Sequence, residues 1–313
     1  MRESGDLRDA AIATLSRLVE SGQEILVTVA DSTSTSKIGP FQKANPERVI
    51  NLGIAEQNMV GVAAGLALGG YTVFTANAAP FLVARANEQV KNDLCYSATN
   101  VKMLGLNAGV SYGPLASTHH AIDDISIMGG FGNVQILAPC DTVETEQIVE
   151  YAASIEGPVY IRMDNAKFPI VHGAEYRFEP GRPDLIVNGS EVVVVALGSV
   201  VGEALEACEK IEAETGKRVS LVNLSSIRPL DEAKLTAILE AHKAVVTVEE
   251  HSLHGGIGAK IAMLIARQGL ALKLRTLGIT EGEFAYYGTR KRIREHYGID
   301  AAGVARTIAE VLD

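Results

Sequence analysis

Two consecutive α/β domains, each built on a parallel sheet, are the fold that this sequence predicts. Short apolar segments rich in valine and isoleucine alternate with longer segments of helical periodicity along most of the chain. This alternation is typical of parallel sheets covered by helices on both faces. A non-periodic stretch with three prolines, at 165–184, interrupts the alternation, and 313 residues are enough for two hydrophobic cores. We therefore expect a first domain at 1–170, a linker at 171–188 and a smaller second domain at 189–313.

The first domain is expected to begin with an amphipathic helix and to continue with alternating strands and helices. The expected elements are a helix at 7–19, strands at 24–30 and near Val49, a helix from Glu56 to a stop at Gly69-Gly70, strand 71–76, helix 80–93, strand 101–106, a Gly-rich loop at 107–117, helix 118–128, strand 134–137, helix 142–154 and strand 159–162. Sites of parallel sheets lie on the loops that leave the carboxyl ends of strands. Asp31, Glu56, the 107–119 loop and Arg162 all occupy such positions.

The second domain is expected to repeat the same alternation on a smaller scale. The expected elements are strand 191–196, helix 202–215, strand 218–224, helix 231–241, strand 245–249, helix 256–268, strand 272–277 and two terminal helices. The glycines of Gly198-Ser-Val-Val-Gly202 follow a strand, but the third glycine and the downstream acid of a dinucleotide fingerprint are missing. We therefore expect helix–strand packing there. His251 and His254 precede Gly255-Gly256-Ile-Gly258 at the expected start of a helix, and we expect a structural role for them.

Composition excludes some function classes and indicates the compartment. The formal charge of −10 argues against a nucleic-acid groove or an anionic membrane surface. The longest apolar stretch, residues 59–68, is too short to span a bilayer, and the first residues lack the apolar region of a secretory signal. Cys95, Cys140 and Cys208 form no CxxC pair, so we expect reduced, structural thiols in a cytoplasmic protein.

Glu56 is the most informative residue, because it lies between a β-type segment and a helix of small apolar residues. An acid at this position has two interpretations. It either stabilises the helix start, where the dipole favours an acid by up to about 1 kcal/mol, or it is a buried carboxylate that exchanges a proton with a heteroaromatic nitrogen. If Val60, Ala63 and Ala64 keep the site dry, desolvation outweighs the dipole, and Glu56 is suited to acid–base chemistry near neutral pH.

The segment Gly53-Ile-Ala-Glu-Gln-Asn-Met59 resembles the glutamate motif in the pyrimidine-binding half of transketolases, in particular the separate C-terminal subunit of split transketolases. The resemblance extends over essentially the whole chain. It implies a thiamine diphosphate pyrimidine-binding domain followed by a smaller transketolase C-terminal domain. It also implies that Glu56 is catalytic, because the family's glutamate hydrogen-bonds the aminopyrimidine of thiamine diphosphate and so activates the cofactor.

The same resemblance assigns three further residues to the cofactor. Phe81 is similar to the phenylalanine that stacks on the aminopyrimidine, although a lone helical aromatic would more often be a core residue. Arg85 in the same helical segment, and Asp31 in the loop after a strand, are expected near the thiamine as well. Asn87 departs from the tyrosine often found in this helix, which puts that tyrosine's hydrogen bond in doubt.

Thr118-His119-His120 resembles the Thr-His-Gln signature of the family, with His120 in place of the glutamine. The resemblance assigns His119 to catalysis and to substrate binding, since a histidine can titrate near neutrality and hydrogen-bond a sugar oxygen. Two adjacent loop histidines would otherwise suggest a metal, but no further ligand follows at a suitable spacing. We expect no metal ligands in this chain.

The resemblance also predicts how the substrate is held. Arg8 and Arg162 occupy positions similar to phosphate-binding arginines of transketolases, and arginine holds phosphate by forked hydrogen bonds. Asn107 stands where many members place a substrate-contacting histidine. Pro114 and Leu115 replace the two acids of the family's Gly-Glu-Asp, so the usual pentose phosphates need not be the substrates.

The sequence is expected to supply only half of a cofactor site. The family's magnesium and diphosphate motif, a Gly-Asp-Gly segment followed by an asparagine about one helix later, is absent from the sequence. We therefore expect an N-terminal partner subunit to bind most of the Mg²⁺ and the diphosphate. Small residues at 61–70 suit close packing between two copies of this chain, so we expect a homodimer within an α2β2 assembly.

The function implied is transfer of a two-carbon ketol unit from a ketose, expected to be a sugar phosphate, to an aldose. Two alternatives remain open. One is the β subunit of a 2-oxo acid dehydrogenase, which uses the same glutamate chemistry, and the other is a non-catalytic regulatory partner, which the altered loop at 111–117 suggests.

Overall fold

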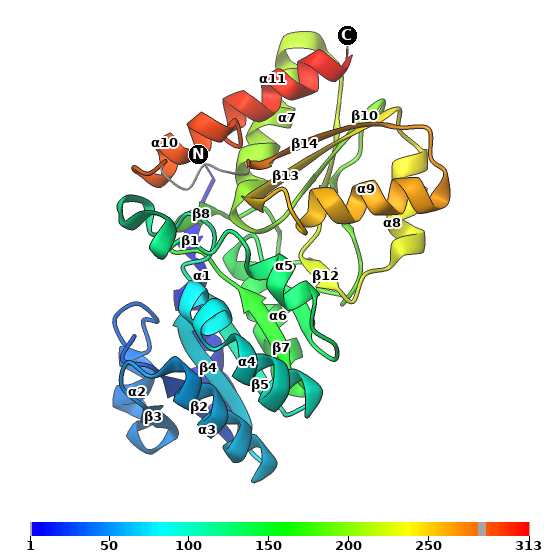
Figure 1. Ribbon diagram of the computed structural model, residues 1–313. Helices are drawn as coiled ribbons and strands as arrows, with labels where there is room; N and C mark the ends of the chain where they lie inside the picture. The colour runs from blue at the N-terminus through cyan, green and yellow to red at the C-terminus, as the bar shows by residue number, and fades with distance from the viewer. Residues whose placement is uncertain (1, 281–285, 313) are drawn as a thin grey trace.

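The structure, a computed structural model, describes residues 2–280 and 286–312. It confirms the predicted α/β class, with two sheets that lie one above the other in Figure 1 and carry helices on both faces. A short antiparallel pair, β1 (Ser4–Asp6) with β8 (Lys167–Pro169), joins the beginning and the end of the first domain. Among the described residues, no helix is long and apolar enough to cross a membrane.

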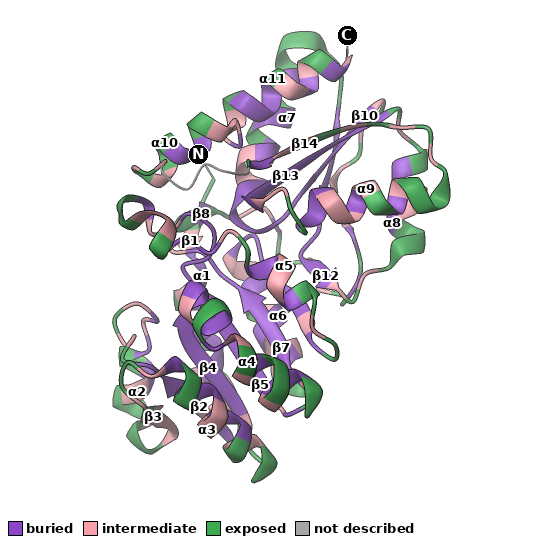
Figure 2. Cartoon of the chain, viewed as in Figure 1, coloured by how far each residue is buried: buried purple, intermediate pink, exposed green. Residues whose placement is uncertain are grey.

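In the described part of the chain, the first sheet has seven strands in the order β12-β6-β7-β5-β4-β2-β3. Its strands are β2 (Ile25–Val29), β3 (Val49–Asn51), β4 (Thr72–Ala78), β5 (Val101–Leu106), β6 (Gln135–Leu137), β7 (Val159–Arg162) and β12 (Ser226–Arg228). All are parallel except β12, which pairs antiparallel with β6. The central strands are buried along their length (Figure 2), which is why they form continuous apolar runs in the sequence.

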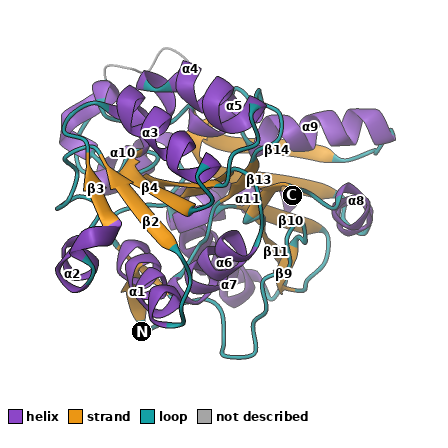
Figure 3. Cartoon of the chain, turned by 90° about the horizontal axis from the view of Figure 1, so that it is seen from below, coloured by secondary structure: helices purple, strands orange, loops and turns teal. Residues whose placement is uncertain are grey.

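Helices cover both faces of this sheet, as the view in Figure 3 shows. One face packs against α1 (Leu7–Glu20) and α6 (Thr142–Ser154), and α2 (Gly39–Ala44) lies beside α1. The other face packs against α3 (Glu56–Leu68) and the helical segment that follows β4. Strands β2, β4 and β5 are parallel neighbours, so the loops that follow them lie at the same edge of the first sheet, where α3 begins.

The described residues of the second domain form five strands in the order β14-β13-β10-β11-β9. The strands are β9 (Asp184–Val187), β10 (Val192–Ala196), β11 (Ser220–Asn223), β13 (Ala244–Ser252) and β14 (Lys273–Ile279). The helices are α7 (Val201–Thr215), α8 (Glu232–Glu240), α9 (Ile257–Gln268), α10 (Arg290–Tyr297) and α11 (Ala301–Leu312). Helices α7 and α11 cover one face and α8 and α9 the other, so Gly198–Val200 is packed between strand and helix as expected.

Two short strands depart from an all-parallel arrangement. Strand β9 lies inside the predicted linker, 171–188, yet it pairs antiparallel with β11. Strand β12 comes from the second half of the chain but completes the first sheet. The predicted domain boundaries at 170 and 188 therefore stay predictions, because β9 lies between them and β12 crosses from the second half of the chain to the first sheet.

Two helix predictions are wrong in detail. The predicted helix at 118–128 begins only at Asp124 (α5, Asp124–Gly129), because Gly109 and Ala121 pair as an isolated antiparallel bridge that keeps the chain extended there. A 3-10 helix, Gly113–Thr118, precedes it. The predicted helix at 80–93 is a π-helix (Phe81–Arg85), then α4 (Asn87–Gln89), then a second π-helix (Val90–Tyr96).

Candidate active site

Glu56 is the first residue of α3 and its side chain is 3% exposed. The residue before the helix is Ala55, which has no side chain able to cap it. Glu56 is therefore not a solvated helix cap. Met59 and Val60, which follow within one turn, are fully buried, so the helix packs into the core directly after Glu56.

Arg85 and Asn77 approach this carboxylate from two neighbouring segments. Nη1 of Arg85 lies 2.6 Å from Oε2 of Glu56, and Nδ2 of Asn77 lies 3.4 Å from Oε1. Asn77 lies next to the last residue of β4 and is fully buried, and its Oδ1 accepts no hydrogen bond from any described residue. The ion pair brings together two residues that the sequence assigned separately, whereas Asn77 was missed because an asparagine near the end of an apolar strand carries no motif.

Phe81 begins the π-helix that carries Arg85, and the guanidinium carbon of Arg85 lies 4.4 Å from the centre of the Phe81 ring. Phe81 is not a core residue, since it is only partly buried. His119 packs edge-on against Phe81, with a centroid separation of 5.3 Å, and against Tyr112 at the same separation. Glu56, Arg85, Phe81, Tyr112 and His119 thus form one continuous surface, of which sequence reasoning missed Tyr112.

The loop 107–121 carries Tyr112 and His119 to this surface. Asn107, at its start, is buried and has a positive φ of 55°, a conformation that asparagine tolerates better than most residues. His120 is turned inward, and its Nε2 lies 3.1 Å from the carbonyl oxygen of Gly113. Burial lowers the pKa of His120, which favours the neutral ring that donates this bond. His119 therefore lines the site while His120 holds the loop.

Arg8 and Asn107 meet at the side of the site that faces α1. Nη1 of Arg8 lies 3.4 Å from Oδ1 of Asn107 and 3.1 Å from the carbonyl oxygen of Thr35. Asp6 accepts two hydrogen bonds from the Arg8 side chain, at 3.1 and 2.8 Å. Asp31 is exposed at the end of β2 with a φ of 58°, and its backbone N–H donates to Oδ1 of Asn51.

The structure does not bring Arg162 together with Arg8. Arg162 is 3% exposed and its Nε lies 2.9 Å from Oδ2 of Asp124. Its Nη2 donates to the carbonyl oxygens of Ala121 and of Glu250, which belongs to β13 of the second domain. Burial among these acceptors places Arg162 in the contact between the domains.

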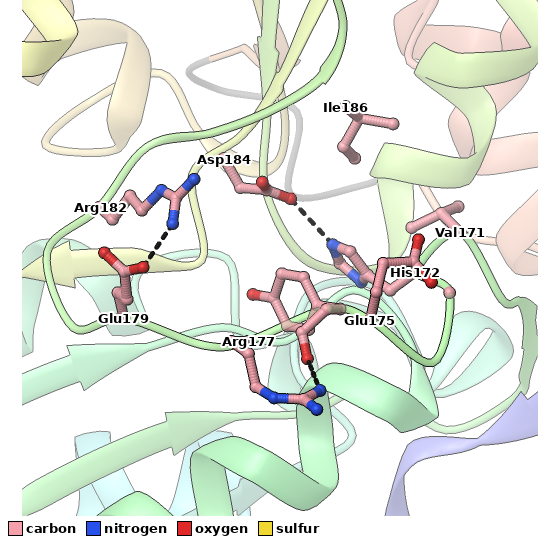
Figure 4. A pocket seen from close by; sticks show the side chains of 10 residues that line it. Val171, His172, Glu175, Arg177, Glu179, Arg182, Asp184 and Ile186 are labelled. Carbon is pink, nitrogen blue, oxygen red and sulfur yellow. Dashed lines mark hydrogen bonds and ion pairs between the residues drawn. The ribbon is translucent and has the colours of Figure 1, made fainter.

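The pocket in Figure 4 lies elsewhere, along the segment between the two domains. It has a volume of about 450 Å³, and His172 is one of the residues that line it. Nδ1 of His172 lies 2.9 Å from Oδ2 of Asp141, and Nε2 lies 3.0 Å from Oδ2 of Asp184. Burial lowers the pKa of His172, but these two carboxylates raise it, with a net value of about 10. Cys140, Asp141 and His172 are close enough to hold a metal ion, yet both ring nitrogens of a protonated His172 already serve the two carboxylates.

Two family profiles together account for nearly the whole chain. The profile "Transketolase, pyrimidine binding domain" matches residues 3–169, and "Transketolase, C-terminal domain" matches residues 181–304. Glu56, Phe81, Arg85 and His119 all lie in the first of these ranges. The second range covers the sheet built on β10, β11, β13 and β14.

Similar proteins of known sequence and structure point the same way. An apulose-4-phosphate transketolase subunit of Actinobacillus succinogenes is 51% identical over 286 residues, which are 91% of this chain and 92% of that protein. A transketolase C-terminal section from Methanocaldococcus jannaschii is 36% identical over 95% of this chain and 93% of its own length. A solved split gene transketolase, described as an inactive beta4 tetramer, superimposes with a TM-score of 0.87 at 36% identity and covers 99% of both chains.

Proposed function

The chain belongs to the transketolase family, as a separate C-terminal subunit, and from this premise we propose how its residues take part in thiamine diphosphate-dependent ketol transfer. The observation that carries the proposal is the buried carboxylate of Glu56, held by Arg85 beside the partly buried ring of Phe81. A carboxylate, a cation and an aromatic face within one small surface suit a flat, basic heterocycle.

The residues present fit the aminopyrimidine of the cofactor. The orphan Oδ1 of Asn77 lies in the same buried corner as Glu56 and leaves polar capacity for a ligand. Glu56 would hold a proton at a ring nitrogen, and Phe81 would fix the plane of the ring. When bound, thiamine diphosphate supplies the electron sink that carbon–carbon bond cleavage next to a carbonyl requires. In the absence of the cofactor, Arg85 compensates the buried charge of Glu56 through their ion pair. The pyrimidine ring would replace or share this ion pair when it binds.

His119 and Arg8 are the proposed contacts of the sugar. His119 borders the Phe81 ring, where it can hydrogen-bond a substrate oxygen and move a proton. Arg8 is 13% exposed, reaches Asn107 and can present N–H groups to a phosphate. Asp31 at the neighbouring loop would border the thiamine. The donor is therefore proposed to be a ketose phosphate, of the class named in the Actinobacillus succinogenes relative.

A partner subunit is proposed to complete the site, because the described part of this chain holds only the pyrimidine half. Two large apolar side chains next to the site are unusually exposed, Ile54 at 77% and Leu115 at 52%. Exposed apolar groups that border a site are typical of a surface covered in an assembly. The partner would bind Mg²⁺ and the diphosphate, and two copies of each chain would make an α2β2 tetramer. A cytoplasmic location is part of the proposal, supported by three buried free thiols.

The test is an assay of the chain reconstituted with its N-terminal partner, thiamine diphosphate and Mg²⁺. Ketol transfer from a ketose phosphate to an aldose is expected, without oxidation of 2-oxo acids by an artificial electron acceptor. Oxidation alone would favour a 2-oxo acid dehydrogenase β subunit. Absence of both activities, with a stable complex formed, would favour a regulatory partner.

A further inference from the structure

We propose that Glu250, in β13 of the second domain, is a positioning residue that fixes the 107–121 loop and thereby places His119 in the active site. The consequence for turnover rests on the proposed function, whereas the effect on the loop does not. Through this residue the second domain, whose described residues contribute no side chain to the surface around Glu56, would still control catalysis.

The first step is a direct contact between Glu250 and the loop. The backbone N–H of Val110 donates to Oε1 of Glu250 at 2.8 Å, and these two residues are 1% and 2% exposed. Gly109, just before Val110, has a φ of 61°, and a Cβ at this position would collide with Oε1 of the same carboxylate. The loop backbone therefore approaches Glu250 as closely as glycine alone permits.

The second step is that Glu250 is itself held firmly. Arg290 binds both carboxylate oxygens, at 2.9 and 3.0 Å, and Nε of Arg294 lies 2.5 Å from Oε2. Burial raises the pKa of Glu250, but these two guanidinium groups lower it to a net value of about 2. The carboxylate is thus a fixed anion, and a hydrogen bond to an anion is stronger than one to a neutral acceptor.

The third step is that the loop is attached to the second domain at both ends. Near its start, Ser111 donates to Asp164 at 3.0 Å, and Arg290 pairs with the same oxygen at 2.7 Å. Beyond its end, the backbone N–H of Ser252 in β13 donates to the carbonyl oxygen of Ile122 at 2.7 Å. Glu250 and Ser252 lie two residues apart on one strand, so they act on the loop as one rigid edge.

The fourth step leads from these attachments to the site. Gly109 and Ala121 exchange two backbone hydrogen bonds of 2.9 Å, which close the base of the loop. Tyr112 and His119 project from the closed loop and pack against each other, and His119 then packs against Phe81. A shift at Val110 would therefore displace the His119 ring relative to Phe81, and displacement of a catalytic group by about 1 Å can cost on the order of 10²-fold in rate.

The experiment compares Glu250→Gln with Glu249→Gln. Glu249 precedes Glu250 and is equally buried, but it accepts from Ile257 and Gly258 at the start of α9, inside the second domain. The first readout is amide hydrogen exchange of the isolated chain. Glu250→Gln should accelerate exchange in peptides covering 107–121 by at least about tenfold, since bonds to charged groups are the strong ones, and Glu249→Gln should leave those peptides unchanged.

The second readout is turnover of the complex reconstituted with the partner. Glu250→Gln should lower kcat by about 10–100-fold. The thiamine diphosphate concentration that gives half-maximal activity should stay within a few-fold of that of the wild-type complex. His119→Ala should cost much less in the Glu250→Gln background than in the wild-type chain, because the histidine is already misplaced there. Gly109→Ala, which disturbs the same contact from the loop side, should reproduce both effects if Glu250→Gln does not fold.

The outcomes separate this inference from the proposed function. The positioning role would be overturned if Glu250→Gln left the amide exchange rates of the 107–121 loop unchanged. It would also be overturned if His119→Ala lowered kcat by the same factor in the Glu250→Gln chain as in the wild-type chain. If the wild-type complex shows no ketol transfer, the proposed function fails, while the exchange data still decide whether Glu250 fixes the loop.

Discussion

The two regions that surround the 107–121 loop differ sharply in how completely they are paired. In the domain junction, formed by Asp124, Arg162, Asp164, Glu250 and Arg290, all five side chains are largely or fully buried and bound to one another or to backbone. Of the Arg290 guanidinium, only Nη1 has no partner among the described residues. On the other side is the Glu56 face, formed by Ile54, Glu56, Phe81, Leu115 and His119, where large apolar groups stay exposed around one buried carboxylate.

This difference indicates which of the two regions is structurally complete in this chain alone. Buried charges are retained in folded proteins when they are paired, and the domain junction meets that condition by itself. The Glu56 face leaves large apolar side chains exposed to water, which is typical of a surface completed by a ligand and another chain. Changes at the Glu56 face should therefore lower activity. Changes at the domain junction should lower stability, and a change at Glu250 should also lower activity through its contact with the 107–121 loop.

The largest effect is expected from Glu56→Gln, which keeps the shape of the side chain but cannot share a proton. Loss of general acid–base catalysis typically costs 10²–10⁴-fold, so turnover of the reconstituted complex should fall by at least about 10²-fold. Glu88→Gln, in the next helical segment and exposed, is the control and should keep normal turnover. A near-normal rate in Glu56→Gln would remove Glu56 from its assigned role.

Arg162→Ala tests the other side of the comparison. Removing one partner of a buried ion pair leaves Asp124 uncompensated, which costs about 3–5 kcal/mol of unfolding free energy. Arg267→Ala breaks an exposed pair with Glu232 and should cost no more than about 1 kcal/mol. Denaturant unfolding of the wild-type, Arg162→Ala and Arg267→Ala chains measures both losses of unfolding free energy. A stable Arg162→Ala protein with a raised KM for sugar phosphates would return this arginine to the substrate site.

Sequence motifs pointed to residues that the structure brings together at the Glu56 face, but they did not point to the domain junction, for a physical reason. Glu56, Phe81, Arg85 and His119 lie in local motifs, and the strands that precede them, β3, β4 and β5, run parallel and end at one edge. Arg162 also follows a strand, but its partner Asp124 is 38 residues away and its acceptor Glu250 is 88 residues away. No local pattern encodes such pairings, so Arg162 resembled a phosphate ligand and Glu250 escaped notice.

Secondary structure shows the same limit. Helical periodicity correctly placed a helical segment after β4, but it could not distinguish an α-helix from the π-helix at Phe81–Arg85, since the two differ by one residue per hydrogen-bonded turn. The helix predicted at 118–128 began too early because the Gly109–Ala121 bridge is a tertiary pairing. Strand β12 depends in the same way on an edge offered by β6.

His172 predicts a pH dependence for the stability of the segment between the domains. Its pKa is about 10 in the folded chain and about 6.5 when unfolded. A raised pKa stabilises the fold fully below about pH 6.5, and that stabilisation is lost as the pH rises toward 10. Unfolding free energies of wild-type and His172→Gln chains should differ by a few kcal/mol at pH 6, and by progressively less up to pH 10. A difference independent of pH would mean that His172 is neutral in the fold.

A smaller effect is expected from Arg8→Ala. One charge-assisted hydrogen bond contributes about 1.5–3 kcal/mol, so KM for a ketose phosphate should rise by roughly 10–100-fold while KM for the unphosphorylated sugar stays nearly constant. Arg17→Ala, an exposed arginine of the same helix, is the control. Equal losses for both sugars would show that Arg8 only supports the fold around Asp6.

The most direct test of the unfinished Glu56 face is calorimetric titration of thiamine diphosphate and Mg²⁺ into this chain, alone and with its N-terminal partner. The isolated chain offers Glu56, Arg85 and Phe81 to a pyrimidine, which gives at most weak binding and no turnover. Tight binding and ketol transfer should come only when both chains are present. Tight cofactor binding or ketol transfer by the isolated chain would contradict the account, because the diphosphate half of the site would then lie within these 313 residues.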